Sequence, residues 1–273
     1  MTGTSLSPPA ACLCSIAFLL AASLSHGRDI FLVGDKFSHP LPSGGAGPEM
    51  VVIRPGKFVF GGGRPGDDPG ELLIEFTRPY AISKTEITAG MYRQYLAATQ
   101  SADLRSFAIT QDDLPVAGIS WDQAESFVAW LSHLTGYHYS LPSSTQWEYA
   151  ARAGSTKTYS WGDAAGDGHA NCTECGEPGD GKPTPVGSFE ANSWGIYDMH
   201  GNVWEWTKDC VDSNSKPPMN GMPQLFGNCE SRELRGGSAE SDAWSIRTNS
   251  RAFAQRKARS SDVGMRVVME LPQ

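Results

Sequence analysis

The sequence predicts an α+β fold with little regular secondary structure. Helical spacing of apolar residues occurs in only three segments, and the expected strands are short. From about residue 155 onward the chain is glycine-rich and nearly free of helical patterns. The 273 residues include 30 glycines and 18 prolines, and a hydrophobic content of 40% suffices for one buried core.

Residues 1–27 are predicted to be a cleaved secretory signal peptide. The apolar run Ala10–Ala22 is too short to cross a bilayer, and small residues allow cleavage after Ser25 or Gly27. Residues 1–9 contain no Lys or Arg, so an uncleaved anchor and a misassigned start remain alternatives. We expect export to the periplasm and no transmembrane segment after cleavage.

Residues 28–48 are expected to form an irregular arm, and residues 49–273 a single domain. Within the domain, Arg54–Lys57 contains a Pro-Gly turn between two apolar runs. Short strands are expected at 50–53, 58–60 and 79–84.

Three helices are expected, from Thr88 to about Ala98, from Ser120 to Gly136, and from Ser143 to Gly154. Each begins at a hydroxyl residue suited to an N-cap. Gln123 and Gln146 lie three residues after their caps, which completes two capping boxes.

The formal net charge is −8, which disfavours binding to nucleic acid. Four cysteines remain after signal cleavage, and an even number in an exported chain favours two disulfides. We expect Cys172–Cys175 and Cys210–Cys229, because this pairing closes the two shortest loops. The alternative is a zinc site at the C-x-x-C sequence, with His169 or the other cysteines completing it.

The run Gly195–Trp206 packs three aromatic residues, two carboxylates, an amide and two glycines into twelve residues. It is too polar for a plain strand and too rich in glycine for a helix. Asp198 and Glu205, with Gly201 between them, suit a hard cation such as calcium, which takes six to eight oxygen ligands from irregular loops. The alternative is that the carboxylates are solvated and the tryptophans fill the core.

Together with four other motifs in order, this run resembles the formylglycine-generating-enzyme (sulfatase-modifying factor) family over about residues 49–269. The other motifs are Leu141–Arg152, Tyr159–Gly162, Leu234–Ser238 and Val263–Arg266. The resemblance implies a C-type-lectin-like fold with little regular secondary structure, often stabilised by calcium.

The resemblance also implies two calcium sites. One would use Asp198, where the family usually has Asn, with Gly201, Val203 and Glu205. The other would use Asn171, the carbonyl of Cys172, Asp180 and the carbonyl of Lys182, across a loop whose length differs from the family's.

The family's oxidases bind copper through two cysteines that follow the Arg-Gly-Gly-Ser motif. In this chain their positions fall at Ser241 or Asp242 and at Ile246 or Arg247, and no cysteine follows Cys229. Thiolates suit Cu(I), so formylglycine formation by the family mechanism is not expected and the chain reads as a pseudoenzyme.

Five residues of the same segment are candidates for a ligand-binding cleft: Glu240, Asp242, Trp244, Arg247 and Arg251. Arg247 and Arg251 are suited to clamp a carboxylate or phosphate. The alternative is that these charges are exposed or pair with one another.

We expect a non-catalytic, periplasmic binding or regulatory factor. The resemblance extends to an accessory protein of type VI secretion, which suggests an envelope or secretion-machinery partner, such as the periplasmic part of a membrane Ser/Thr kinase. One alternative is a copper-independent enzyme, such as one that matures a siderophore chromophore, with Glu240 or Asp242 as acid or base. Another is a carbohydrate- or ligand-binding lectin-like module that uses Trp244.

Overall fold

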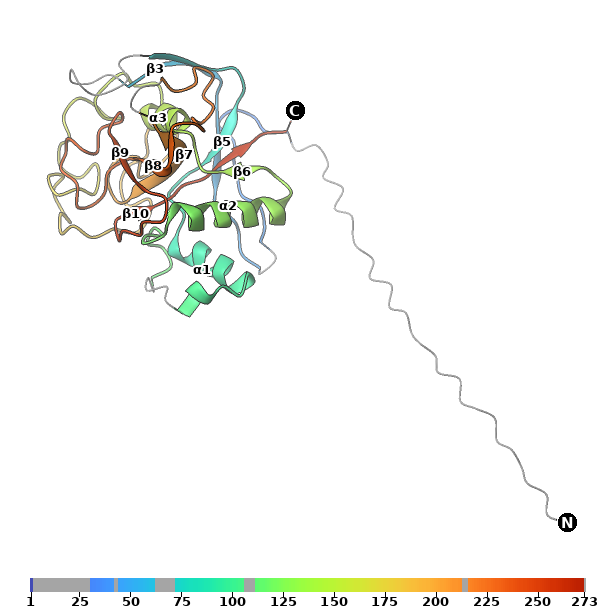
Figure 1. Ribbon diagram of the computed structural model, residues 1–273. Helices are drawn as coiled ribbons and strands as arrows, with labels where there is room; N and C mark the ends of the chain where they lie inside the picture. Colours follow the sequence, from blue (N-terminus) through green and yellow to red (C-terminus); the bar gives the residue numbers. More distant parts are fainter. Residues whose placement is uncertain (2–29, 42–43, 62–71, 106–110, 213–215, 273) are drawn as a thin grey trace. The chain divides into compact units, whose positions relative to one another are not determined.

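The computed structural model describes residue 1 and residues 30–41, 44–61, 72–105, 111–212 and 216–272 (Figure 1). The expected signal peptide and most of the glycine-rich loop after Phe60 therefore lie outside the described residues. Phe31–Gln273 form one compact unit, to which the following description applies.

The strands expected near the N-terminus are present. They are β2 (Met50–Ile53), β3 (Gly56–Phe60) and β5 (Tyr80–Ser83), and two further strands, β1 (Lys36–Phe37) and β4 (Leu72–Phe76), accompany them. β1 lies in the arm that was expected to be irregular, and it pairs with β2. The sequence patterns did not single out β4, which pairs along its whole length with β3.

The three expected helices are confirmed, with their caps. They are α1 (Ala89–Ala98), α2 (Trp121–Thr135) and α3 (Ser144–Arg152), and the 3-10 helix η1 (Ala102–Arg105) follows α1. Ser120 and Ser143 each accept a hydrogen bond from the third residue of their helix, and Gln123 and Gln146 return the bond.

The remaining strands all lie after α2. They are β6 (Tyr139–Ser140), β7 (Trp204–Val211), β8 (Asn228–Arg235), β9 (Arg251–Gln255), β10 (Val263–Gly264) and β11 (Val268–Glu270). A five-stranded sheet has the order β1-β2-β5-β11-β6, and a four-stranded sheet has the order β10-β7-β8-β9. β3 and β4 form a separate hairpin, which lies away from α1 and α2 in Figure 1.

Two large apolar clusters form most of the core in the described residues, and a smaller third one surrounds the Cys172–Cys175 disulfide. One packs α1 and α2 against the sheets, with Phe127, Leu131 and Trp206 buried. The other lies beneath the β3–β4 hairpin and α3, with Phe60 and Trp147 at its centre. α3 therefore presents its signature residues to the middle of the domain, where the functional motifs meet.

Both expected disulfides are confirmed. Cys172 pairs with Cys175, and Cys210 in β7 pairs with Cys229 in β8. The alternative zinc site is therefore wrong, because both sulfurs of the C-x-x-C sequence are bonded to each other.

Candidate functional site

The signature motifs meet first at a buried ion pair between Glu205 and Arg266. Arg266 donates from Nε to Oε2 of Glu205 at 2.6 Å and from Nη2 to Oε1 at 2.7 Å. Trp147 donates from its indole nitrogen to the same Oε2 at 2.6 Å. Neither charged side chain is exposed to solvent. Since an unpaired charge would be costly here, this contact locks three separate motifs together.

A second buried ion pair joins one more motif, Leu234–Ser238, to Leu141–Arg152 through Glu148. Arg235 of the Arg-Gly-Gly-Ser motif donates to Oε2 of Glu148 at 2.6 Å, while Arg152 donates to Oε1 at 2.9 and 2.7 Å. The guanidinium carbon of Arg235 also lies 5.2 Å from the ring centroid of Trp147. One carboxylate therefore holds two guanidinium groups in the centre of the domain.

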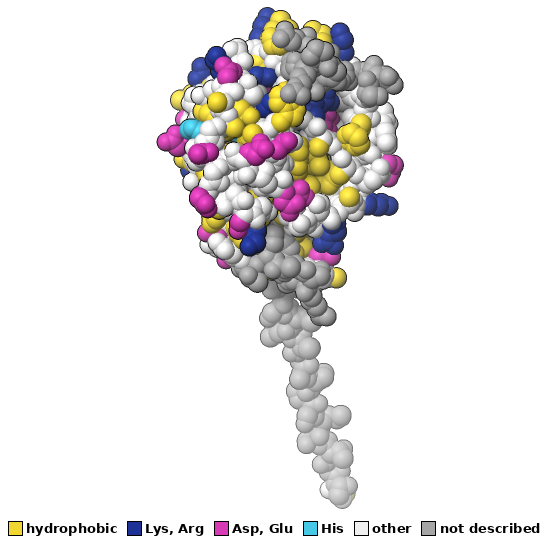
Figure 2. Space-filling model, turned by 90° about the vertical axis from the view of Figure 1, so that its left-hand side faces the viewer, with side chains coloured by type: hydrophobic (Ala, Val, Ile, Leu, Met, Phe, Trp, Pro, Cys, Tyr) yellow, Lys and Arg dark blue, Asp and Glu magenta, His cyan; other side chains and the backbone are white. Residues whose placement is uncertain are grey.

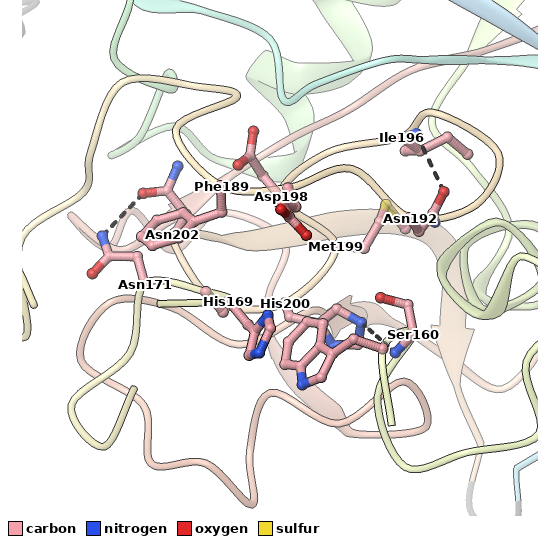
Figure 3. Close-up of a pocket in the computed structure, with 13 residues that line it drawn as sticks. Ser160, His169, Asn171, Phe189, Asn192, Ile196, Asp198, Met199, His200 and Asn202 are labelled. Carbon is pink, nitrogen blue, oxygen red and sulfur yellow. Dashed lines mark hydrogen bonds between the residues drawn. The ribbon is translucent and has the colours of Figure 1, made fainter. Parts of the chain in front are cut away.

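Gly201 brings the two expected calcium-binding segments into contact. Its φ is +78°, and a Cβ at this position would clash with the carbonyl oxygen of Asn171. The neighbouring Asn202 donates its backbone N–H to that oxygen at 3.0 Å. The amide of Asn171 donates to Oδ1 of Asn202 at 3.2 Å (Figure 3). The glycine is thus required by a close backbone approach.

The first expected calcium set is only partly suited to a cation. Oε2 of Glu205 accepts two hydrogen bonds, and Oε1 would have to be shared between Arg266 and calcium. Asp198 accepts a bond from the backbone N–H of Gly187 at 2.7 Å. Burial is the main cause that raises the pKa of Asp198 to about 6, and the charge of Glu205 adds to it.

The sequence analysis missed a third carboxylate here, Glu86. It is buried and accepts bonds from the backbone of Val203 and the side chain of Asn202. Burial first, and then the charges of Asp198 and Glu205, hold its pKa well above the ordinary value. Three carboxylates face one buried guanidinium, so this region lacks positive charge. Position 86 directly precedes a buried isoleucine, and only the fold brings it to this site.

The second expected calcium set fits a cation better. Oδ1 of Asn171 is buried and has no hydrogen-bond partner, while its amide nitrogen donates to the carbonyl oxygen of Lys182 at 2.8 Å. Asp180 accepts the backbone N–H of Lys182 at 3.1 Å, and the carbonyl of Cys172 follows directly after Asn171. An unpartnered buried oxygen beside a carbonyl suits calcium, which coordinates both groups.

Among the residues that the structure describes, no three His, Cys, Asp or Glu side chains form a metal-binding group. A cation at either set would therefore depend on amide and carbonyl oxygens as well as carboxylates.

In the segment that stands where the family has its copper cysteines, serine hydroxyl groups form a hydrogen-bond network. Oγ of Ser241 accepts the backbone N–H of Ser238 at 3.0 Å and lies 3.3 Å from its hydroxyl. Ser238 in turn donates to Asp262 at 3.3 Å. Ile246 is wholly buried. Every cysteine in the described residues is in a disulfide, so none of them supplies a thiolate.

The five cleft candidates do not form one site. Arg251 pairs with Glu233 through both carboxylate oxygens, so the expected clamp with Arg247 is wrong. Arg247 lies over the ring of Trp244, 3.1 Å from its centroid, and donates to the carbonyl oxygen of that residue.

The two acidic candidates are not suited to acid–base catalysis. Asp242 accepts the backbone N–H of Ser245 at 2.8 Å. Hydrogen bonds from Ser245 lower the pKa of Asp242, which leaves it a poor proton carrier near neutral pH. Glu240 is exposed, and neither residue lines either of the two pockets described below.

His200 has a structural role in the smaller pocket. Its Nε2 accepts the backbone N–H of Ser160 at 3.2 Å, and its Nδ1 donates to the carbonyl oxygen of Ile246 at 2.7 Å (Figure 3). Burial lowers the pKa of His200 to about 4, which agrees with a neutral ring. Trp161 lies between the rings of His169 and His200, so aromatic side chains fill most of this space. The cavity holds only about 10 Å³.

A much larger pocket, of about 880 Å³, lies beside the β3–β4 hairpin. Its walls come from β3 and the turn before it, from the end of α3 with the following loop, and from residues 247–249. Of the cleft candidates, only Arg247 lines it. The sequence analysis did not find this pocket, although the basic turn Arg54–Lys57 next to Phe58 was a signal for it.

No helix in the described part of the chain combines the length and apolar character that crossing a membrane requires.

Residues 37–271 match the family described as the sulfatase-modifying factor enzyme 1-like domain. The chain is 40% identical over 103 residues to the formylglycine-generating enzyme of Mycobacterium tuberculosis, covering 34% of this chain and 32% of that protein. It is 34% identical over 182 residues to the serine/threonine-protein kinase pkn1 of Chlamydia caviae, covering 59% of this chain and 28% of the kinase.

Among solved structures, PvdO from Pseudomonas aeruginosa is similar at a TM-score of 0.78 and 30% identity. The match covers 89% of this chain and 100% of that one. The curated relatives are matched over a much smaller share of their own length, 32% and 41% for two formylglycine-generating enzymes.

Proposed function

The chain belongs to the sulfatase-modifying factor enzyme 1-like family, and on that premise we propose that it is an exported binding protein without the family's copper chemistry. The observation that carries the proposal is the segment after Arg-Gly-Gly-Ser. Ser241 or Asp242 and Ile246 or Arg247 stand at the positions of the two thiolates, and the segment contains a hydroxyl network at Ser241 and a buried aliphatic side chain at Ile246. The expected signal peptide supports export, and the two disulfides suit an oxidising compartment.

Copper binding tests the non-catalytic part of the proposal. The purified chain is expected to take up no Cu(I) in competition with a chromogenic chelator, and to leave a cysteine-containing sulfatase peptide unoxidised. The matched variant Ser241→Cys/Ile246→Cys restores a thiol pair at the same positions and is expected to gain Cu(I) binding. Stoichiometric Cu(I) uptake or peptide oxidation by the unaltered chain would overturn the proposal.

The proposed partner is an envelope protein, in particular the periplasmic part of a membrane Ser/Thr kinase that activates type VI secretion. The support is that a protein named as a Ser/Thr kinase contains a segment similar to this domain. The exposed part of the 239–251 segment is the proposed contact, because Trp244 is 40% exposed there.

Binding of the purified kinase ectodomain, measured by biolayer interferometry, tests this partner. Trp244→Ala is expected to weaken binding by roughly tenfold or more, as loss of a central aromatic contact does. Phe253→Ala is the matched control, since Phe253 is also an exposed aromatic residue, at 68%. Absence of binding, or equal losses in both variants, would contradict the partner while leaving the copper result unaffected.

Calcium is the proposed cofactor. The unpartnered oxygen of Asn171 and the carboxylate excess around Glu86 both support a bound cation. Calcium added to chelator-treated protein should release heat in a calorimeter and raise the melting temperature by mass action. Asn171→Ala should abolish the response, whereas Asp163→Asn, at an exposed loop carboxylate, should retain it. No heat and no change in melting temperature for the unaltered chain would exclude calcium.

A second candidate is a copper-independent enzyme acting on a small molecule, including the siderophore chromophore maturation considered above. It is favoured by the 880 Å³ pocket and by the match to the full length of PvdO. The described groups give it no evident acid or base, because Asp242 is tied to Ser245.

A further inference from the structure

The 880 Å³ pocket is basic, although the chain as a whole is acidic. The net charge of the protein is −8. Among the residues that the structure describes, the pocket lining nevertheless contains a single carboxylate, Asp163, against several cations. These cations are Arg54, Lys57, Arg152, Lys157 and Arg247. In Figure 2 Lys and Arg side chains gather toward the upper edge of the face shown, while Asp and Glu side chains cross its middle. Charge is thus separated within the molecule.

Three of these cations have carboxylate partners. Arg152 pairs with the buried Glu148, and Lys157 pairs with Asp163 at 2.7 Å. Lys57 lies 3.3 Å from Glu75, but both of these side chains are more than half exposed. An exposed pair of this kind contributes little and is easily rearranged.

Two of the cations, Arg54 and Arg247, lie against indole rings. The guanidinium carbon of Arg54 is 5.6 Å from the ring centroid of Trp194. That of Arg247 is 3.1 Å from the centroid of Trp244. A guanidinium over a ring face is attracted by the ring and still carries N–H groups that can pair with a carboxylate.

Aromatic side chains form an apolar part of the same lining. Tyr149 meets Trp194 edge to face, with centroids 4.9 Å apart, and meets Phe58 at 5.1 Å. All three line the pocket. At its rim, Val59 and Leu73 are opposite one another in the β3–β4 hairpin and are exposed by 46% and 53%. A ligand with a flat aromatic ring would therefore make the most favourable packing contacts with this surface.

We propose that this pocket binds an anionic aromatic small molecule, an aromatic carboxylate, whose ring packs against Phe58 and Trp194 and whose carboxylate pairs with the exposed Arg54. The volume lies within the range of roughly 300–1,000 Å³ that is typical of small-molecule sites. The site meets the copper-type segment only at its end, because Arg247 lines the pocket whereas Ser238 and Ser241 do not. It also goes beyond the partner proposed above, which would contact exposed Trp244.

The test uses the full chain and a matched pair of probes, 2-naphthoate and its neutral amide, followed by tryptophan fluorescence and calorimetry. The carboxylate is expected to bind at least about tenfold more tightly than the amide, which corresponds to one charge-assisted hydrogen-bonded pair. An aliphatic carboxylate of similar size should also bind about tenfold more weakly, because it cannot stack. Added salt should weaken the binding of the carboxylate and leave the affinity for the amide unchanged.

Two substitutions connect the binding to the pocket. Arg54→Gln should reduce the affinity for the carboxylate to about that of the amide, without changing the affinity for the amide. Arg78→Gln is the matched control, because Arg78 is an exposed arginine outside the lining. Arg54 is itself exposed, so its variant should fold normally, which the melting temperature verifies. Trp194→Phe should weaken the binding of both probes by a similar factor.

Equal affinity for the acid and the amide would overturn the proposal. So would the absence of binding of either probe at 1 mM, a concentration that corresponds to a binding free energy of about −4 kcal/mol. Equal losses in Arg54→Gln and Arg78→Gln would also overturn it. Binding of an acidic peptide without any aromatic carboxylate would assign the pocket to another class of ligand. None of these outcomes affects the copper or kinase experiments.

Discussion

The arginines at the centre of the domain and those at the large pocket are used in opposite ways. Arg235 and Arg266 are wholly buried, and each donates to a buried carboxylate. Arg54, by contrast, is exposed and lies against the ring of Trp194 at the pocket wall, and the guanidinium of Arg247 lies over the ring of Trp244. The buried arginines of the family-type motifs therefore hold the fold together, whereas the proposed ligand site also uses residues outside those motifs, such as Arg54.

Elementary electrostatics explains the division. A buried guanidinium without a carboxylate would lose its hydration with no compensation, so the centre has to pair every arginine. At the pocket, water and ring faces stabilise the charge, and a carboxylate there would compete with a ligand.

The largest expected effect is at the centre. Arg266→Leu should reduce the free energy of unfolding by about 3–5 kcal/mol, because Glu205 is left buried without its countercharge. Arg54→Leu, at the exposed pocket wall, should cost less than about 1 kcal/mol. Urea unfolding of both variants measures this. Similar losses would mean that the two classes of arginine do not differ.

The next expected effect is a pH dependence of the free energy of unfolding that comes from the buried His200. Burial holds the pKa of His200 at about 4 in the folded state, below its ordinary 6.5. The unfolded chain therefore binds more protons between these values, and stability is lost as the pH falls from about 6.5 to about 4. The loss at His200 is on the order of 3 kcal/mol. Asp198 and Asp209, whose pKa values are raised by burial, contribute in the opposite direction over this range. The slope of His200 is therefore the difference between the unfolding curves of the unaltered chain and of His200→Gln at several pH values. An unchanged slope would contradict the neutral ring.

The two disulfides should stabilise the fold by different amounts, because they close loops of different length. Cys210–Cys229 spans 19 residues, and its replacement by two serines should cost about 3 kcal/mol. Cys172–Cys175 spans 3 residues, and its replacement should cost only about 2 kcal/mol. Thermal unfolding of the two double variants gives the ranking, and a reversed ranking would point to a calcium loop that depends on the shorter bridge.

The smallest stability effect is expected at the pocket rim. Glu75→Gln removes the exposed partner of Lys57 and should change the free energy of unfolding by less than about 0.5 kcal/mol. The same change should strengthen binding of 2-naphthoate by roughly two- to threefold, since the local potential becomes more positive. Weaker binding would mean that Lys57 does not contribute to the pocket's field.

Local signals explain which elements were predictable. The N-caps at Ser120 and Ser143 depend on residues three positions apart, and the strands at 50–53 and 80–83 are short apolar runs. β8 was not predictable in this way, because its buried face carries Glu233 and Arg235, which satisfy partners far away in sequence.

The sequence by itself determined the helices, the disulfide pairing, the family and the absence of a cysteine pair after Arg-Gly-Gly-Ser. Each depends on residue type and short spacing. Only the tertiary structure decided that Glu205 pairs with Arg266, 61 positions away, and that Arg251 turns to Glu233 rather than to a ligand. It also decided that Arg54, Tyr149 and Arg247 line one pocket. The physical reason is that a charged side chain takes the partner that lies nearest after folding, and its position in the sequence does not reveal which partner that is.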